Sequence, residues 1–319
     1  MSTIEVTSPF DGRVVGTVPF KTYEEVEAAI DLAQATYLDH KNALPKYKRV
    51  EILEKVVEIM SGQIDELTKL CASEGGKPWM DSQVEVHRAI NGVKLAIEAL
   101  GTYEGKQIAM GHTASSANRL AYTLKEPIGV VAAISAFNHP LNLAVHQIIP
   151  AIAVGCSVVI KPATQTPMSA IRMVEILEEA GLPNGWAQAV VCDRKAGELL
   201  ATSPKVNALT FIGSGKVGWY LNSKVAPGTR VALEHGGVAP VIVEADANID
   251  ELIPSIGKGG FYHAGQVCVS VQRVFVHESI VDEVASKLSD YASKLIVGDQ
   301  LDPKTEVGPL MKQIELKNG

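Results

Sequence analysis

Apolar residues in the first hundred positions recur three or four apart, which is the spacing of helices with one buried face. The clearest examples are Val26, Ile30, Ala33, Ile52, Val56 and Ile59. We therefore predict that this part of the chain is mainly helical and that these side chains pack against a core.

From Ile128 onward the pattern changes to short, almost continuous apolar runs separated by helical stretches. The runs are Val130 to Ile134, Ser157 to Ile160, Ala187 to Val191, Ala208 to Ile212 and Val231 to Leu233. Strands this apolar are buried on both faces, which is typical of a parallel sheet covered by helices. The fold class predicted is α/β, with a doubly wound parallel sheet, and a second α/β region begins near His235 with Val241-Ile242-Val243.

One helix of this region has marked ends. Thr166 is expected to cap its N-terminus and Pro167 to fill its first position, while Ala170, Val174 and Leu177 form its buried stripe. By contrast, the stretch from Gly105 to Lys125 is polar and small-residue-rich, so we expect an exposed excursion or hairpin there.

Composition narrows the class of protein. The chain has 319 residues, 46% of them hydrophobic, which is enough for a large core and suggests two domains. Its net charge of −7 and lack of a basic cluster argue against a nucleic-acid partner. No run is apolar for long enough to span a bilayer and the start carries no secretory pattern, so we expect a cytoplasmic protein.

The four cysteines suggest chemistry at one position only. Cys71, Cys156 and Cys192 stand far apart without CxxC spacing, so neither a metal site nor a redox pair is predicted. Cys268 follows Glu234 by about thirty residues. A thiol can attack a carbonyl carbon and a carboxylate can activate water to release the product, so the two residue types together outline covalent catalysis.

A glycine-rich turn suggests a nucleotide. Gly213, Gly215 and Gly218 form a G-x-G-x-x-G pattern that follows a predicted strand and opens a predicted helix, as a dinucleotide site requires. The plain interpretation of this motif would give the acid about twenty residues later, Glu234, to a ribose. That role conflicts with a catalytic Glu234, and the pattern alone leaves both open.

The chain resembles the NAD(P)-dependent aldehyde dehydrogenase superfamily over essentially its whole length. The resemblance rests on an ordered series of short runs. They are Ser8-Pro9-Phe10-Asp11-Gly12, Glu74-Gly75-Gly76-Lys77-Pro78, Pro127-Ile128-Gly129-Val130, Phe137-Asn138-His139-Pro140-Leu141, Lys161-Pro162-Ala163-Thr164-Gln165-Thr166-Pro167, Phe211-Ile212-Gly213-Ser214, Leu233-Glu234-His235-Gly236-Gly237 and Gly265-Gln266-Val267-Cys268.

The resemblance implies a role for each matching position. Cys268 would be the nucleophile, Glu234 the base, and Asn138 a donor to the oxyanion together with the backbone N–H of Cys268. An aldehyde would become a thiohemiacetal, then a thioester, then a carboxylic acid. NAD or NADP would be held at residues of the matching runs and of the glycine motif, and at Gly197, where the family often approaches the cofactor. These residues are Lys161, at the adenosine ribose, with Thr164, Gly197, Gly213, Ser214, Val217 and Gly218.

Several positions depart from the family pattern. Phe137 stands where tryptophan is common, His139 follows the asparagine, and His235 follows Glu234. The ordinary interpretation of both histidines is that they are packed and hydrogen-bonded, although a histidine near a carbonyl could also bind an anionic group. Thr164 stands where many NAD-preferring members carry a glutamate, so NADP is compatible with the sequence.

The substrate is expected to be a small-molecule aldehyde. Members that act on phosphonate- or phosphate-bearing aldehydes, and bacterial lactaldehyde-type members, look similar around residues 137–139 and 261–268. This favours a small anionic aldehyde, although Val267 beside the nucleophile offers no cation.

The resemblance also implies a domain division. Residues 1–104 and 126–234 would form the dinucleotide-binding domain, residues 105–125 an oligomerisation excursion, and residues 235–319 an incomplete catalytic domain. Relatives continue past Gly319, so we expect a fragment or a truncated product, whose oligomeric assembly is left open although full-length relatives are homo-oligomers.

Three alternatives were weighed. A CoA-acylating relative would pass the acyl group to a thiol, and Glu234 argues against it because water activation would then be unnecessary. A catalytically inactive or nucleotide-binding-only scaffold is the second. A cysteine protease using Cys268 and His263 is the third, but five residues of separation do not bring two side chains together.

Overall fold

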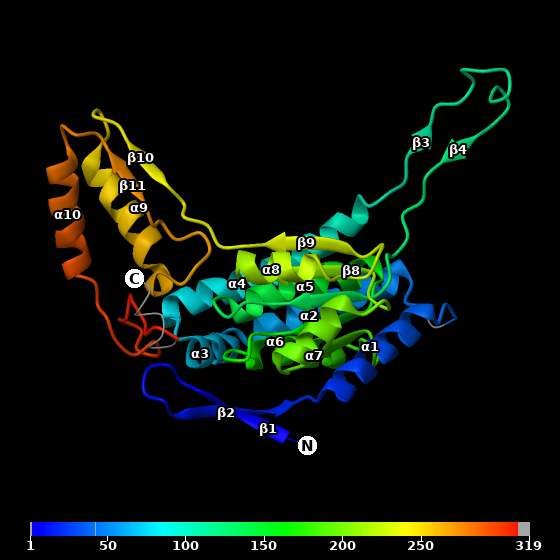
Figure 1. The fold of residues 1–319 in the computed structure, drawn as a ribbon, viewed down its shortest axis with the longest axis horizontal. Coiled ribbons are helices and arrows are strands. Elements are labelled where there is room, and N and C mark those ends of the chain that lie inside the picture. The colour runs from blue at the N-terminus through cyan, green and yellow to red at the C-terminus, as the bar shows by residue number, and fades with distance from the viewer. Residues whose placement is uncertain (1, 42, 312–319) are drawn as a thin grey trace.

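The computed structural model describes residues 2–41 and 43–311. Figure 1 shows a central sheet body, a long hairpin projecting on one side and a smaller unit rising on the other. The strands are β1 (Ser2–Thr7), β2 (Val14–Phe20), β3 (Gln107–Ile108), β4 (Ala121–Tyr122), β5 (Val131–Ile134), β6 (Val158–Lys161), β7 (Ala187–Ala189), β8 (Ala208–Ile212), β9 (Arg230–Glu234), β10 (Val241–Val243) and β11 (Val274–Val276).

The helices are α1 (Tyr23–Leu38), α2 (Lys46–Gly62), α3 (Ile64–Gly75), α4 (Trp79–Gly101), α5 (Pro140–Val154), α6 (Met168–Glu179), α7 (Arg194–Thr202), α8 (Gly215–Asn222), α9 (Ile249–Phe261) and α10 (Val281–Ser293), with a short 3-10 helix, η1 (Tyr262–Gly265). The helical stripes predicted in the first hundred residues belong to α1 and α2, where Val26, Ile30, Ala33, Ile52 and Val56 are buried and Ile59 is half-buried.

The prediction of a doubly wound sheet is confirmed. All five predicted apolar runs form strands of one parallel sheet with the order β7-β6-β5-β8-β9. The chain therefore builds outward from β5 in one direction and then returns to place β8 on its other side. This reversal between β5 and β8 is the switch point at which such sheets open a crevice for a ligand.

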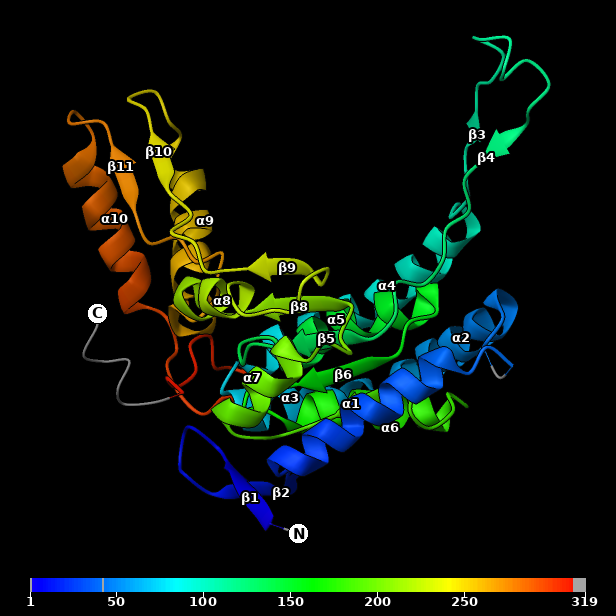
Figure 2. The same ribbon diagram turned by 45° about the vertical axis from the view of Figure 1, so that its right-hand side comes forward.

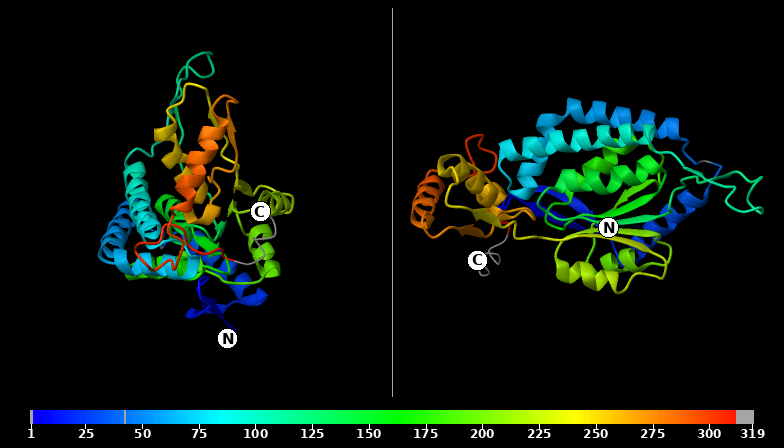
Figure 3. Two further views of the ribbon diagram at one scale, coloured as in Figure 1. Left: turned by 90° about the vertical axis from the view of Figure 1, so that its left-hand side faces the viewer. Right: turned by 90° about the horizontal axis from the view of Figure 1, so that it is seen from above.

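Alternation along the strands divides the core into two layers. Val131 and Ala133 pack with α2 to α6, whereas Val130 and Ala132 pack with α1, α7 and α8. Both faces of the sheet are thus covered, as Figures 2 and 3 show from two directions. This explains why the strands carry apolar residues at consecutive positions instead of only at every second one.

The prediction for the first residues was incomplete, because β1 and β2 form an antiparallel hairpin before the first helix. Val6 and Val18 are buried in this hairpin and pack with Val191. Gly12 has a φ of 74° in the turn that joins the strands, a conformation that favours glycine. The two strands are short, so their alternation of apolar and polar residues was overlooked beside the helical spacing of the residues that follow.

The start of α6 was predicted wrongly. Pro167, not Thr166, occupies the N-cap position, and the Thr166 hydroxyl instead donates to the Phe137 carbonyl at 3.3 Å. The cap is Glu74 of α3, whose carboxylate accepts from the backbone N–H of Met168 at 2.7 Å and of Ser169 at 2.8 Å. A side chain almost a hundred residues away therefore supplies what a local cap normally supplies.

Burial raises the pKa of Glu74 to about 7, although the hydroxyl and backbone N–H of Ser169 and the N–H of Met168 act in the opposite direction. The folded protein therefore prefers the protonated carboxyl, and this group's contribution to stability is full below pH 4.5 and is lost as the pH rises to 7. Replacing Glu74 by glutamine should remove this pH dependence. The free energy of unfolding of the wild type should fall by on the order of 3 kcal/mol over this range because of Glu74, and that of Glu74→Gln should not. Urea unfolding of both proteins at pH 5, 6, 7 and 8 measures the difference. Glu66→Gln, an exposed position on the same helix, is the control, and equal slopes in Glu74→Gln and wild type would contradict the prediction.

The predicted excursion is the antiparallel pair β3–β4, in which Gln107 faces Tyr122 and Ile108 faces Ala121. It projects from the body (Figure 1). Leu120, Tyr122 and Leu124 are 75%, 63% and 73% exposed. The smaller unit contains the parallel pair β10–β11 with α9 and α10 packed together.

Candidate active site

A cavity of about 670 Å³ lies at the switch point of the sheet. Its lining comes from the segments after β5, β8 and β9 and from a segment of the smaller unit. These lining residues are Ile134 to Asn138, Ala163, Phe211 to Ser214, Val217, Glu234 to Gly237, Ala264 to Cys268, Gln272 and Leu310. The carboxyl ends of three neighbouring strands therefore form one wall, and the chain around Cys268 faces them.

The three residues predicted to be catalytic line this same cavity. Asn138 follows β5, Glu234 is the last residue of β9, and Cys268 belongs to the smaller unit. Asn138 is 8% exposed, whereas Glu234 is exposed and Cys268 half-buried. The fold thus brings an amide, a carboxylate and a thiol from three distant segments to one space.

Cys268 differs from the other cysteines in its surroundings. All four thiols are free, and Cys71, Cys156 and Cys192 are buried. Burial raises the pKa of Cys71 well above its usual range and that of Cys192 to about 11. Such thiols are poor nucleophiles at neutral pH because the thiolate is the reactive form.

The segment before Cys268 has an unusual backbone. His263 and Ala264 have φ values of 49° and 54°, in the left-handed region that side chains with a Cβ seldom adopt. The Gln266 side chain ties this segment to the end of the described chain, donating to the Pro309 carbonyl at 3.3 Å and accepting from the Met311 N–H at 2.9 Å. The sequence showed Gln266 only as part of a motif, and its bracing contacts depend on the fold.

The glycine motif lies where the sequence predicted, between β8 and α8. The hydroxyl of Ser214 caps α8 by accepting from the Val217 N–H at 3.4 Å. At Gly218 an added Cβ would lie 2.4 Å from Nε2 of His235. Gly218 therefore has a packing requirement of its own, while Gly213, Ser214 and Val217 line the cavity.

The two histidines of the motifs are packed against aromatic rings. His235 lies between Phe211 and Trp219, with ring centroids 6.3 and 5.8 Å away. The ring of His139 stacks on Tyr262 at 6.0 Å. Burial, together with the positive charges of Lys77, Arg88 and His146, lowers the pKa of His139 to about 3. His139 is therefore neutral at physiological pH.

Lys161 and Thr164 do not line the first cavity but a second one of about 710 Å³, and Ala163 lines both. Arg194, which the sequence analysis did not single out, lines the second cavity at the start of α7. Gly197 lies against Lys161, since a Cβ there would be 2.9 Å from the lysine Cδ. Two cationic side chains and one carboxylate, Glu5, thus share a cavity beside the candidate active site, and the two cations suit a phosphate-bearing ligand.

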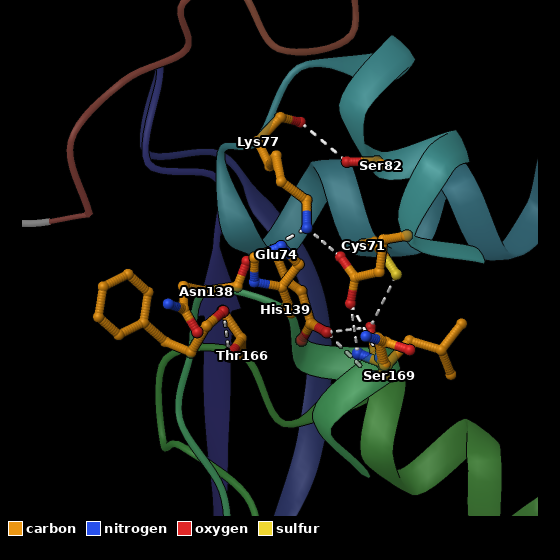
Figure 4. A network of polar contacts seen from close by, with 12 residues as sticks. Cys71, Glu74, Lys77, Ser82, Asn138, His139, Thr166 and Ser169 are labelled. Atoms are coloured by element: carbon orange, nitrogen blue, oxygen red, sulfur yellow. Dashed lines mark hydrogen bonds and ion pairs between the residues drawn. The ribbon is translucent and has the colours of Figure 1, made fainter. Parts of the chain in front are cut away.

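A buried network of polar side chains contacts the backbone of Asn138 (Figure 4). Lys77 and Glu85 form an ion pair in which both side chains are at most 1% exposed. Lys77 also donates to the Asn138 carbonyl at 3.2 Å. Glu85 was missed by the sequence analysis, although an acid among the buried positions of α4 is a recognisable signal.

A doubly wound sheet with a thiol, a carboxylate and an amide around its switch-point cavity defines the class: an α/β protein arranged for chemistry on a small ligand. The particular family follows from comparison with known sequences. The chain belongs to the aldehyde dehydrogenase family, whose model matches residues 1–318. The resemblance stated from the motifs is confirmed.

Individual relatives cover nearly all of the chain. It is 36% identical to 3-sulfolactaldehyde dehydrogenase of Priestia aryabhattai, over 97% of the chain and 64% of that relative. It is 37% identical to lactaldehyde dehydrogenase of Methanocaldococcus jannaschii, over 97% of the chain and 66% of the relative. The crystal structure of glyceraldehyde-3-phosphate dehydrogenase GapN from that organism, complexed with NADP, superposes with a TM-score of 0.91 at 37% identity, over 97% of this chain and 67% of that one. The chain thus spans about two-thirds of the length of these relatives.

Two further findings concern residues 2–41 and 43–311. In this part of the chain no helix is both long and apolar enough to cross a membrane. Nor does this part contain three or more His, Cys, Asp or Glu side chains grouped so that they could hold a metal ion.

Proposed function

We propose that the protein oxidises a small aldehyde to a carboxylic acid with NAD⁺ or NADP⁺. The observation that carries this proposal is the meeting of Cys268, Glu234 and Asn138 around one cavity at the switch point of the sheet. Membership of the aldehyde dehydrogenase family supports it.

The residues divide the reaction into two steps. In the first, the Cys268 thiolate forms a bond to the aldehyde carbon, and the carbonyl oxygen gains the negative charge. The Asn138 amide stabilises this charge together with the backbone N–H of Cys268, which has no hydrogen-bond partner in the described part of the chain. A bound NAD⁺ or NADP⁺ would supply the acceptor for the hydride, so that loss of hydride from the former aldehyde carbon leaves a thioester on Cys268.

In the second step, Glu234 takes a proton from water, and the resulting hydroxide attacks the thioester carbon. The carbon–sulfur bond breaks, so the acid leaves and the Cys268 thiolate is regenerated. The exposed position of Glu234 at the end of β9 gives its carboxylate access to water in the cavity.

The residues present fit a dinucleotide. Ser214 and the N-terminus of α8 open onto the first cavity, where amide groups can face a pyrophosphate. Lys161, Thr164 and Arg194 line the second cavity. Thr164 carries no charge that would repel a 2′-phosphate, and Lys161 and Arg194 are the cationic side chains that line this cavity. These features favour NADP⁺ as a cofactor alongside NAD⁺.

We propose a small anionic aldehyde as the substrate. Arg88 is one of the cations that act on His139, next to Asn138, so a positive charge other than that of the Glu85-paired Lys77 lies near this end of the site. Two similar proteins are named for 3-sulfolactaldehyde and glyceraldehyde-3-phosphate, both of which carry an anionic group.

Turnover assays test this proposal. The protein is mixed with NAD⁺ or NADP⁺ and either succinic semialdehyde, glyceraldehyde-3-phosphate or the neutral butyraldehyde, and the absorbance of the reduced nicotinamide is followed. We expect kcat/KM to be about tenfold or more higher for the anionic aldehydes, because a charge-assisted contact contributes roughly this much. Equal values for the neutral aldehyde would contradict the substrate class, and no reduction with any aldehyde would contradict the activity.

We make three further proposals, on association, location and the roles of the two regions. We propose that the β3–β4 hairpin mediates association with further copies, which its exposed Leu120, Tyr122 and Leu124 support. We also propose a cytoplasmic location, in which the four free thiols would remain reduced. Residues 1–104 with 126–234 would bind the dinucleotide, and residues 235–319 would contribute the nucleophile.

A further inference from the structure

We infer that the buried ion pair Lys77–Glu85 positions Asn138 for the attack of Cys268 on a carbonyl. The inference rests on the proposed function, in which the Asn138 amide stabilises the oxyanion. It assigns a role to two residues that do not touch the substrate.

The ion pair holds the chain at Asn138 and in the first turn of α5, which follows it. The Lys77 ammonium contacts Glu85 and donates to the Asn138 carbonyl at 3.2 Å. The other carboxylate oxygen of Glu85 accepts from the N–H groups of Leu141 and Asn142, both at 3.0 Å. The backbone carbonyl of Asn138 and the first turn of α5 are therefore both fixed by the same ion pair; Figure 4 shows Lys77 together with Asn138.

The Asn138 side chain depends on this backbone support. It is 8% exposed, and its Oδ1 atom has no hydrogen-bond partner among the residues that the structure describes. No hydrogen bond from its amide nitrogen is found in this part of the chain either. Because the side chain makes no hydrogen bond of its own in this part of the chain, its direction depends on the backbone to which it is attached and on packing.

The capping of a helix by a buried glutamate does not in itself require a lysine. Glu74 caps α6 in the same way that Glu85 caps α5, and its carboxylate makes no ion pair among the described residues. Burying an ion pair contributes little net stability compared with apolar side chains of similar size. Beyond its ion pair with Glu85, the Lys77 ammonium makes one further contact, to the Asn138 carbonyl.

The test separates acylation from alkylation of Cys268. With p-nitrophenyl acetate the thiolate bonds to the acyl carbon, an oxyanion forms, and nitrophenolate leaves; with iodoacetamide iodide leaves and no oxyanion forms. We expect Asn138→Ala to slow acylation about a hundredfold and Lys77→Met about tenfold, with alkylation rates within about twofold of wild type in both. Lys258→Met is the matched control, because Lys258 pairs with Asp81 and is 54% exposed.

A double-mutant cycle tests whether Lys77 acts through Asn138. In the Asn138→Ala background, Lys77→Met should change the acylation rate less than about twofold, since the side chain that it positions is gone. Additive effects would overturn the inference. If Asn138→Ala slows acylation but Lys77→Met does not, the inference fails and the proposed function stands. If Asn138→Ala has no effect on acylation, the proposed function itself loses its oxyanion donor.

A further variant distinguishes a loss of positioning from a loss of folding. Lys77→Met leaves the Glu85 charge unpaired, whereas Lys77→Met with Glu85→Gln removes both charges, keeps an amide oxygen to accept from the N–H groups of Leu141 and Asn142, and should restore the thermal stability. We expect this double variant to remain at least about tenfold slower in acylation despite its recovered stability. Recovery of acylation along with stability would show that the pair serves the fold alone, and would overturn the inference.

Discussion

Replacement of Cys268 by alanine should abolish the acyl-enzyme and reduce turnover of any aldehyde by at least about a thousandfold, because no other group can form the thioester. The remaining three thiols are buried and cannot substitute for it. Intact-mass analysis after mixing with p-nitrophenyl acetate should show one acetyl group on the wild-type protein and none on Cys268→Ala.

Cys192→Ala is the control for this experiment. Burial raises the pKa of the Cys192 thiol to about 11, so its removal should leave both the adduct and the rate unchanged. Retention of the acetyl group in Cys268→Ala, or its loss in Cys192→Ala, would mean that a residue other than Cys268 is the nucleophile. Either result would contradict the proposed mechanism.

Replacement of Glu234 by glutamine should stall the reaction at the thioester. Glutamine keeps the size of the side chain but cannot take a proton from water, and general-base catalysis contributes roughly 10² to 10⁴ in rate. The steady-state rate should fall by that factor while a burst of product formation close to one equivalent remains. A rapid-mixing experiment with nitrophenolate release measures both phases.

Glu244→Gln provides the matched control, since Glu244 follows the next strand, β10, and does not line the cavity. Its kinetics should equal those of wild type. A burst that disappears in Glu234→Gln would mean that this carboxylate acts before the thioester forms, for example in deprotonating Cys268, and not in its hydrolysis.

Local sequence patterns were sufficient to predict most of the central sheet. The five strands were predictable because they lie between two helical layers, so apolar residues fill consecutive positions. The candidate catalytic positions were also accessible, since Asn138, Glu234 and Cys268 each belong to a short run of fixed order. Their roles come from the family resemblance, while their meeting in one cavity comes from the fold.

What the sequence did not reveal depends on contacts between distant segments. Thr166 satisfies the local rule for a helix cap, yet Glu74 occupies that role because α3 packs beside the start of α6. Arg194 joins Lys161 only when α7 and β6 come together, and no spacing along the chain shows this. The hairpin of the first twenty residues was missed because its apolar alternation is short.

The capping of α5 and α6 by glutamates from distant segments also affects how the chain folds. The carboxylates that complete the first turns of α5 and α6 lie 56 and 95 residues earlier in the chain, at Glu85 and Glu74. Contacts of such sequence separation slow the folding of a chain released all at once, because long loops must close first. During synthesis on the ribosome the order is favourable, since both acids have emerged before the helices that need them.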